Sequence, residues 1–304
     1  MEISKKNGNI VFNEEYHRYW DINSNEDYVS VTTLIHKFTQ PFDEIFWSRY
    51  KTFELLLGNK FSLYKSSILK VKKIPNELII ESGITLEDFE KAHIELQNTW
   101  KKTKEDSCIR GTKIHLEKEN AFYDKKIQDI SKYNFGGKIN LIGDFICEQN
   151  KFDLSIDRGI FPEFLVHFTT KDNLLKIAGQ IDLLIKDGND LIIIDHKTNK
   201  KLNFKSGVDF NTKKNATMLY PINNLMDCNM MHYTMQLSLY AYMLQRIDPN
   251  FNIKKLMIIH YDHENNTNYY ELDYLKDEVE RMLKYYKKII INNSNKNKSK
   301  RIEY

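Results

Sequence analysis

Residues 179–197 have the sequence GQIDLLIKDGNDLIIIDHK, which predicts a β-hairpin at the centre of a sheet. Two apolar runs flank the turn signal Asp-Gly-Asn-Asp. The second run is four unbroken apolar residues, as expected of a strand that is buried on both faces. A hairpin centred between Gly188 and Asn189 places Asp182 almost opposite Asp195. Cross-strand neighbours have Cβ atoms roughly 5 Å apart, which is close enough for two carboxylates to share one cation.

The two aspartates interrupt apolar strands, where unpaired carboxylates repel each other and lose hydration. A bound divalent metal would remove that cost. Either aspartate alone is better explained as an acid at a solvated strand end, since acidic residues are mostly exposed. Lys197 favours the metal site, because strand residues two apart share a face and its cation therefore lies beside Asp195. Phosphodiester hydrolysis requires an acid that holds a metal. It also requires a nearby cation that orients water or stabilises a pentacovalent phosphate.

Three further polar residues are candidates for the same site. Glu163 begins a strand predicted over 161–169, where it reaches either the sheet face of the aspartates or solvent. Gln236 and Tyr240 are four apart and therefore share one face of an apolar helix predicted over 232–246. Buried polar groups need partners, so these two either bond within the core or contact a nucleic-acid backbone or Lys197.

His115 ends the sequence RGTKIH at 110–115, early in a helix with a glycine one turn before it. A lone histidine is usually not a ligand, so its residue type alone does not make it one. The glycine allows a neighbouring backbone to approach closely.

The remaining chain alternates helical and strand patterns. Ser30 is a plausible helix N-cap, and Pro75 and Gly83 interrupt a mainly helical region over 43–104. A long helix over 86–122 is expected to kink or restart at 110–112. The other predicted elements are a hairpin at 9–12 and 16–21, strands at 174–186, 254–261 and 268–272, and a closing amphipathic helix from 275. Hairpins followed by a crossover helix predict a mixed α/β sheet with helices on its faces.

Residues 198–230 have no clear periodicity, and a segment this long without regular structure is usually functional or disordered. It holds five lysines that could track phosphates, or that could belong to a solvated flexible segment. The lysines are Lys200, Lys201, Lys205, Lys213 and Lys214. Its aromatic residues Phe204, Phe210 and Tyr220 could stack on bases.

The composition argues against several other classes of protein. A net charge of +3 is too small to argue for nucleic acid by itself, so any basic surface must be local. The three scattered cysteines, Cys108, Cys147 and Cys228, predict reduced thiols rather than a disulfide framework or a zinc site. The N-terminal residues hold no apolar signal segment, and no run approaches the roughly 20 apolar residues that cross a bilayer. A protein of the cytoplasm is therefore expected.

In chain order, five elements together resemble the PD-(D/E)XK nuclease superfamily, specifically its RecB-like exonuclease branch. They are the G-T-x-x-H block ending at His115, Glu163, the G-x-x-D block ending at Asp182, Asp195-His-Lys197-Thr, and Gln236-x-x-x-Tyr240. The resemblance covers roughly residues 108–262. The Ser30-Val-Thr-Thr segment is similar to the N-terminal part of phage-encoded members, which would place the protein in the cytoplasm of a bacterial host.

The resemblance implies a restriction-endonuclease-like core, with a central mixed β-sheet flanked by helices and an added N-terminal hairpin and helical region. It implies that Mg²⁺ or Mn²⁺ binds His115, Asp182, Asp195 and the backbone carbonyl of His196, with Glu163 bound directly or through water. The implied catalytic set is Glu163, Asp182, Asp195, Lys197, Gln236 and Tyr240. Iron–sulfur members carry four cysteines that this chain lacks, so no iron–sulfur cluster is expected.

We therefore expect an accessory hairpin and helical region over 1–104, a nuclease core over 105–291 and a disordered polar tail over 292–304. The expected activity is hydrolysis of DNA, by an exonuclease on single-stranded or end-bearing DNA in replication, recombination or repair. The alternatives are a non-catalytic nucleic-acid-binding module that keeps the fold, and a structure-specific endonuclease or RNase. Cleavage in the presence of metal would distinguish the nuclease from a non-catalytic module. Cleavage of circular DNA or of RNA would distinguish an endonuclease or an RNase from an exonuclease.

Overall fold

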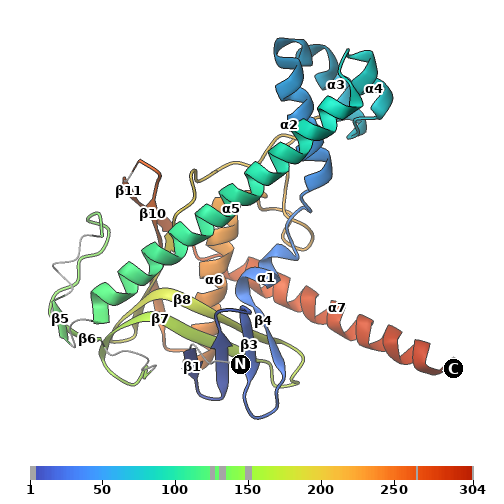
Figure 1. The fold of residues 1–304 in the computed structure, drawn as a ribbon. Coiled ribbons are helices and arrows are strands. Elements are labelled where there is room, and N and C mark those ends of the chain that lie inside the picture. The colour runs from blue at the N-terminus through green and yellow to red at the C-terminus, as the bar shows by residue number, and fades with distance from the viewer. Residues whose placement is uncertain (1–4, 124–126, 130–134, 148–152, 265, 303–304) are drawn as a thin grey trace.

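The computed structural model describes residues 5–123, 127–129, 135–147, 153–264 and 266–302, and its framework is one large mixed β-sheet (Figure 1). Its central strands are β7 (Arg158–Thr169), β8 (Lys176–Asp187) and β9 (Asp190–Lys197), which are antiparallel to one another. Strand β10 (Asn252–Tyr261) pairs parallel to β9, and β11 (Thr267–Leu272) pairs antiparallel to β10. The mixed sheet predicted from the sequence is confirmed.

Short strands extend this sheet on both sides. The N-terminal hairpin joins it through β4, which pairs parallel to the first half of β8. The second half of β8 pairs instead with β9, so β8 has different neighbours along its length. The short strands are β1 (Lys5–Asn7), β2 (Ile10–Asn13), β3 (Arg18–Asp21), β4 (Asp27–Ser30), β5 (Ile127–Asp129) and β6 (Asp144–Cys147).

The β8–β9 hairpin has the register that the sequence predicts. Asp187 pairs with Asp190 at the turn, and Leu183 pairs with Ile194 at the far end of the ladder. The next position in this register brings Asp182 opposite Asp195. The four apolar residues of β9 are all buried, so the strand is covered on both faces.

Helix α6 (Asn229–Ile247) connects the parallel strands β9 and β10 and covers one face of the sheet. The buried cluster beneath it includes Leu184, Ile193, Leu239 and Met243. Helix α1 (Val31–His36), capped by the Ser30 side chain as predicted, and helix α7 (Lys276–Ile302) both pack against α6. Helix α7 continues to Ile302, whereas the polar composition predicts a disordered tail over 292–304.

Helix α5 (Leu86–Tyr123) is continuous, so the break expected at 110–112 is wrong. Two tertiary contacts explain why the helix persists there. The Arg110 guanidinium donates to the Thr198 carbonyl at 2.7 Å and to the Asp262 carbonyl at 2.7 Å. The C-terminal end of α5 places Phe122 in a buried cluster with Leu183 and Ile194. This cluster covers the sheet face opposite to α6.

The N-terminal half of α5 projects from the sheet and carries a small helical knob at its end (Figure 1). The knob has its own apolar core, in which Phe53, Ile68, Ile79 and Phe89 are almost fully buried. As predicted, Pro75 and Gly83 lie between helices rather than within one. Its elements are α2 (Glu44–Leu57), the 3₁₀ helix η1 (Gly58–Phe61), α3 (Ser62–Val71) and α4 (Asn76–Glu81).

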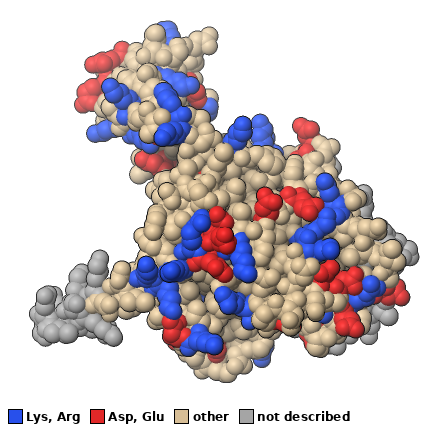
Figure 2. All heavy atoms as spheres, turned by 180° about the vertical axis from the view of Figure 1, so that it is seen from behind, with Lys and Arg blue, Asp and Glu red and all other residues tan. Residues whose placement is uncertain are grey.

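On the face seen in Figure 2, lysines and arginines are interspersed with aspartates and glutamates, in keeping with the small net charge. Residues 198–228 form no named helix or strand and contain only two isolated β-bridges, as the missing periodicity predicts. The described cysteines are free thiols, two of them buried. Within the described ranges, no helix is long and apolar enough to cross a membrane.

Candidate metal-dependent active site

Three potential metal ligands converge from three different elements. His115 lies on α5, Glu163 on β7 and Asp182 on β8, and one ligand atom from each lies within 4.8 Å of the others. His115 Nδ1 is 3.5 Å from Asp182 Oδ2 and 3.8 Å from Glu163 Oε1. One imidazole nitrogen and two carboxylate groups at this spacing fit a small divalent cation such as Mg²⁺ or Mn²⁺.

Glu163 enters this group because the backbone of β7 is irregular there. Its φ of +51° is in the left-handed region, which costs a non-glycine residue about 1 kcal/mol or more. The ladder pairs Pro162 with Leu183, and in this register Glu163 lies opposite Asp182. Gln180 Nε2 donates to Glu163 Oε2 at 2.6 Å and leaves Oε1 toward the histidine. The sequence predicts the residue but not this conformation, which holds the carboxylate among the other ligands.

The backbone of His196 contacts two of these three side chains. Its N–H donates to Asp182 Oδ2 at 2.6 Å. Its carbonyl lies 3.1 Å from His115 Nε2, and a carbonyl can only accept, so this nitrogen donates and Nδ1 faces the carboxylates. The carbonyl predicted as a metal ligand therefore contacts the histidine in this structure.

The electrostatics of the group favour a bound cation. Burial and the charge of Asp195 raise the pKa of Asp182 to about 8. The nearby Asp182 charge raises the pKa of His115 to about 9, against the effect of burial. Both shifts show that the buried carboxylates need positive charge, which a proton on the histidine supplies in part and a divalent cation would supply more fully.

Asp195 is 1% exposed and lies beside this group rather than within it. Its Oδ1 accepts a hydrogen bond from Gln236 Nε2 at 3.0 Å. Its Oδ2 is 2.6 Å from Lys197 Nζ, yet this buried oxygen accepts no hydrogen bond of good geometry from the described residues. A buried carboxylate oxygen with a remaining lone pair could still accept a cation, so the predicted second aspartate also fits the metal.

Lys197 is a half-buried cation in direct contact with a carboxylate. Burial alone would lower its pKa, but attraction to Asp195 and Asp182 outweighs burial and raises it. Its ammonium also lies 4.6 Å from the centre of the Tyr233 ring, where the negative ring face adds attraction. The lysine therefore remains charged and suits charge stabilisation better than proton abstraction.

Gln236 and Tyr240 connect helix α6 to the aspartate. The Gln236 amide that donates to Asp195 also donates to the Tyr240 hydroxyl at 3.4 Å. Tyr240 is 3% exposed, and burial raises its pKa well above the ordinary value, so it stays neutral. A Cβ added at Gly179 would lie 2.6 Å from the Tyr240 ring, which explains the glycine of the G-x-x-D block.

Arg110 also positions this site, although the sequence does not mark it as a site residue. Its guanidinium donates to the carbonyls of Thr198, Tyr261 and Asp262 and fixes α5 against the ends of β9 and β10. This contact holds the helical turn that carries His115. Its partners are backbone atoms at least 88 positions away, so the local sequence has no signal for them.

The five predicted phosphate-contacting lysines lie on the irregular segment that leaves the site after Lys197. All five are exposed, and among the described residues none forms an ion pair with a site carboxylate. Of the aromatic residues there, Phe204 is 54% exposed and Tyr220 is 65% exposed. The structure therefore brings the two aspartates, Glu163, His115, Lys197, Gln236 and Tyr240 together, and leaves the lysines at the surface.

Comparison with known proteins assigns a family to this fold and site. The model of the PD-(D/E)XK nuclease superfamily matches residues 149–300, half of the chain, and the chain belongs to this superfamily. The match spans Glu163, Asp182, Asp195 and Lys197, while His115 precedes it. No curated protein matches the chain. A solved crystal structure of SSO0001 is similar over 88% of this chain and 78% of its own, with 15% sequence identity and a TM-score of 0.34.

Proposed function

We propose that this chain is a Mg²⁺- or Mn²⁺-dependent deoxyribonuclease of the RecB-like exonuclease branch. It would hydrolyse phosphodiester bonds at DNA ends or in single strands during replication, recombination or repair. The observation that carries the proposal is the group of His115, Glu163 and Asp182, with the ion pair of Asp195 and Lys197 beside it. Membership in the nuclease superfamily supports the class of reaction.

His115 Nδ1, Glu163 Oε1, Asp182 Oδ2 and Asp195 Oδ2 are the atoms that would hold the metal. When bound, the metal would polarise the phosphate and activate water for attack. The His196 carbonyl, predicted as another ligand, would instead hold the His115 ring by accepting from its Nε2 while Nδ1 faces the cation. Cation binding would also relieve the repulsion among the buried carboxylates.

The other residues would orient groups and stabilise charge. The Lys197 ammonium, held by Asp195, would face the phosphate oxygens and stabilise the negative charge that develops during displacement. Gln236 would fix the rotamer of Asp195 by donating to its second oxygen, and Tyr240 would fix Gln236. Each of these contacts positions an acid whose oxygens would otherwise be free to rotate.

DNA is the proposed substrate, and the irregular segment after β9 is the proposed track for its backbone. The five exposed lysines, Lys200, Lys201, Lys205, Lys213 and Lys214, would neutralise phosphates, and Phe204 would stack on a base. Because the segment starts next to Lys197, a strand bound along it would lead directly to the metal ligands.

Cleavage assays test this proposal. End-labelled linear DNA, a closed circle of the same sequence and an RNA copy would each be incubated with the protein and Mn²⁺. Single-nucleotide products from linear DNA and an intact circle are expected. A cut circle would indicate an endonuclease, preferential loss of RNA would indicate an RNase, and binding without turnover would indicate a non-catalytic module.

A further inference from the structure

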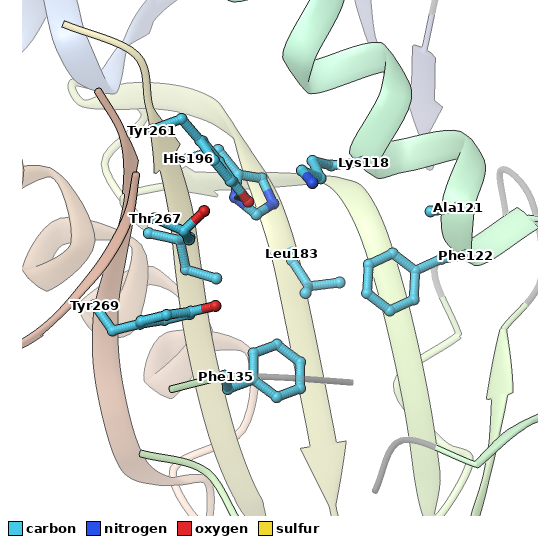
Figure 3. Close-up of a pocket in the computed structure, with 10 residues that line it drawn as sticks. Lys118, Ala121, Phe122, Phe135, Leu183, His196, Tyr261, Thr267 and Tyr269 are labelled. Atoms are coloured by element: carbon cyan, nitrogen blue, oxygen red, sulfur yellow. Dashed lines mark hydrogen bonds between the residues drawn. The ribbon is translucent and has the colours of Figure 1, made fainter. Parts of the chain in front are cut away.

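A cavity of about 190 Å³ lies on the side of the sheet that α5 covers, and it is lined in part by His196, whose backbone contacts the candidate metal ligands. Its floor is made by Leu183 and Ile259, and its walls are largely aromatic. The wall residues come from α5, β9, β10, β11 and the chain before β6, and they include Phe122, Phe135, His196, Tyr261 and Tyr269. Figure 3 shows the hydroxyls of Thr267 and Tyr269 directed into the space and Lys118 at its upper edge.

One residue connects this cavity to the candidate site. The backbone of His196 bonds to Asp182 and His115, whereas its imidazole lines the cavity. The His115 and His196 ring centres are 6.0 Å apart, and the His196 and Tyr261 ring centres are 5.7 Å apart. The His196 side chain therefore lies between the cavity and the candidate metal ligands.

A positive charge lies at the boundary between the two. Lys118 follows His115 by three positions on α5, so both side chains lie on the same side of the helix. Its ammonium is 4.8 Å from the centre of the Tyr261 ring. A ligand that reached from the metal into the cavity would pass this cation.

We propose that the cavity binds one unpaired nucleobase of the DNA strand, next to the phosphate that is cleaved. The proposal rests on the function proposed above. The base would stack on Tyr269 and Tyr261, its edge would meet the hydroxyls of Thr267 and Tyr269, and Lys118 would contact the adjoining phosphate. An apolar floor, aromatic walls, a few polar groups and a cation at the edge match the chemistry of a nucleotide.

This assignment has a consequence for strand choice. A base that is paired and stacked in a duplex cannot enter a cavity of this kind until it is unpaired and rotated out of the stack. The cavity would therefore favour single strands and frayed ends over intact duplex. Stacking tolerates all four bases, so little sequence preference is expected.

The cleavage test uses a single-stranded oligonucleotide in which one abasic site is moved along the sequence. The wild-type protein should cleave about tenfold more slowly when the abasic site lies at one fixed offset from the cut bond. Tyr269→Leu should slow cleavage of intact DNA by a similar factor, with no further loss on the abasic strand. Tyr270→Leu is the matched control, because adjacent residues of β11 point to opposite faces. It should keep the full abasic penalty.

A binding test separates this proposal from the nuclease proposal. The Asp195→Asn variant, checked for folding, would be titrated into single strands that carry 2-aminopurine at successive positions. Quenching at one position, lost in the Asp195→Asn, Tyr269→Leu double variant, supports the base pocket even if the wild type cleaves nothing. Equal fluorescence at every position overturns the proposal. It is also overturned if the rate losses caused by the abasic site and by Tyr269→Leu multiply, or if Tyr270→Leu causes the same loss as Tyr269→Leu.

Discussion

The negative charge of Asp195 is compensated by its neighbours in the site. This carboxylate is almost fully buried, and its two oxygens contact an ammonium and an amide from different elements. A buried ion pair is strongly destabilised when one partner is lost, because the remaining charge has no compensation. Replacing Lys197 is therefore expected to change both the stability of the fold and the rate of cleavage, and these two effects must be measured separately.

Replacing Lys197 by Met should lower single-turnover cleavage by about 10²–10³-fold, as expected when one charge-stabilising donor is removed. Lys197→Arg should recover part of the rate, because it keeps the cation. Lys284→Met, an exposed lysine of α7, should leave the rate within about twofold. A Lys197→Met protein that is folded by circular dichroism and cleaves at the wild-type rate would refute the assigned role.

The pKa values of the ligands predict how metal affinity depends on pH. In the metal-free protein, the pKa of Asp182 is raised to about 8 and that of His115 to about 9. Asp182 and His115 titrate as a coupled pair that holds protons at neutral pH, and Mn²⁺ must compete with those protons. Mn²⁺ affinity should therefore rise between about pH 7 and 9, with proton release on binding.

Isothermal titration in buffers of different ionisation enthalpy measures this proton release directly. Metal-free stability should change in the opposite direction. Both groups have pKa values raised by folding, so the protons that the folded state binds stabilise it at lower pH. This stabilisation is lost as pH rises from 3.8 to about 8 for Asp182 and from 6.5 to about 9 for His115. An affinity for Mn²⁺ that is constant or falls across this range would contradict the assignment of these two ligands.

At the level of elements, close packing of α6 on β8 positions the site. Gly179 lets the Tyr240 ring lie directly over the strand, and an added Cβ would also meet Val31 Cγ2 at 3.1 Å. The close packing of helix α6 therefore keeps Gln236 within hydrogen-bonding distance of Asp195. The spacing of the two elements depends on the absence of a side chain at this one position.

Gly179→Ala should destabilise the protein by about 1–3 kcal/mol, because the methyl group would force Tyr240 or the strand to move. Cleavage should fall as well, since Gln236 moves with its helix. Gly207→Ala is the control, because nothing lies within 4 Å of a Cβ there. Chemical denaturation measures the stability change. Equal midpoints for the two variants would show that the packing at Gly179 is not tight.

Regular elements and the core of the site could be predicted from the sequence, because periodicity and turn residues are local signals. The β8–β9 register followed from the turn, and it brought the two aspartates together. The continuity of α5 could not be predicted, since Arg110 gains its stabilising contacts from the distant carbonyls of Thr198, Tyr261 and Asp262. The left-handed backbone of Glu163 and the aromatic cavity likewise depend on packing between distant segments.

At the scale of the whole molecule, the small net charge requires that DNA contacts be local. Lys213→Gln with Lys214→Gln should weaken DNA binding and make the dependence of log K on log salt shallower by about 1 to 2. Lys284→Gln with Lys288→Gln removes two exposed charges from α7 and should leave that slope unchanged. Fluorescence anisotropy over a salt series measures both. Equal slopes for the two double variants would exclude the segment after β9 as the phosphate track.

The central claim is that one divalent metal held by His115, Glu163 and Asp182 supports cleavage. The most direct measurement records Mn²⁺ binding by electron paramagnetic resonance and cleavage of labelled linear DNA in the same samples. The wild type should bind Mn²⁺ and cleave, and Asp182→Asn should lose at least about 100-fold in both affinity and rate. The exposed control Asp273→Asn should lose neither. Unchanged Mn²⁺ binding in Asp182→Asn, or cleavage that persists with all divalent metal removed, would contradict the account.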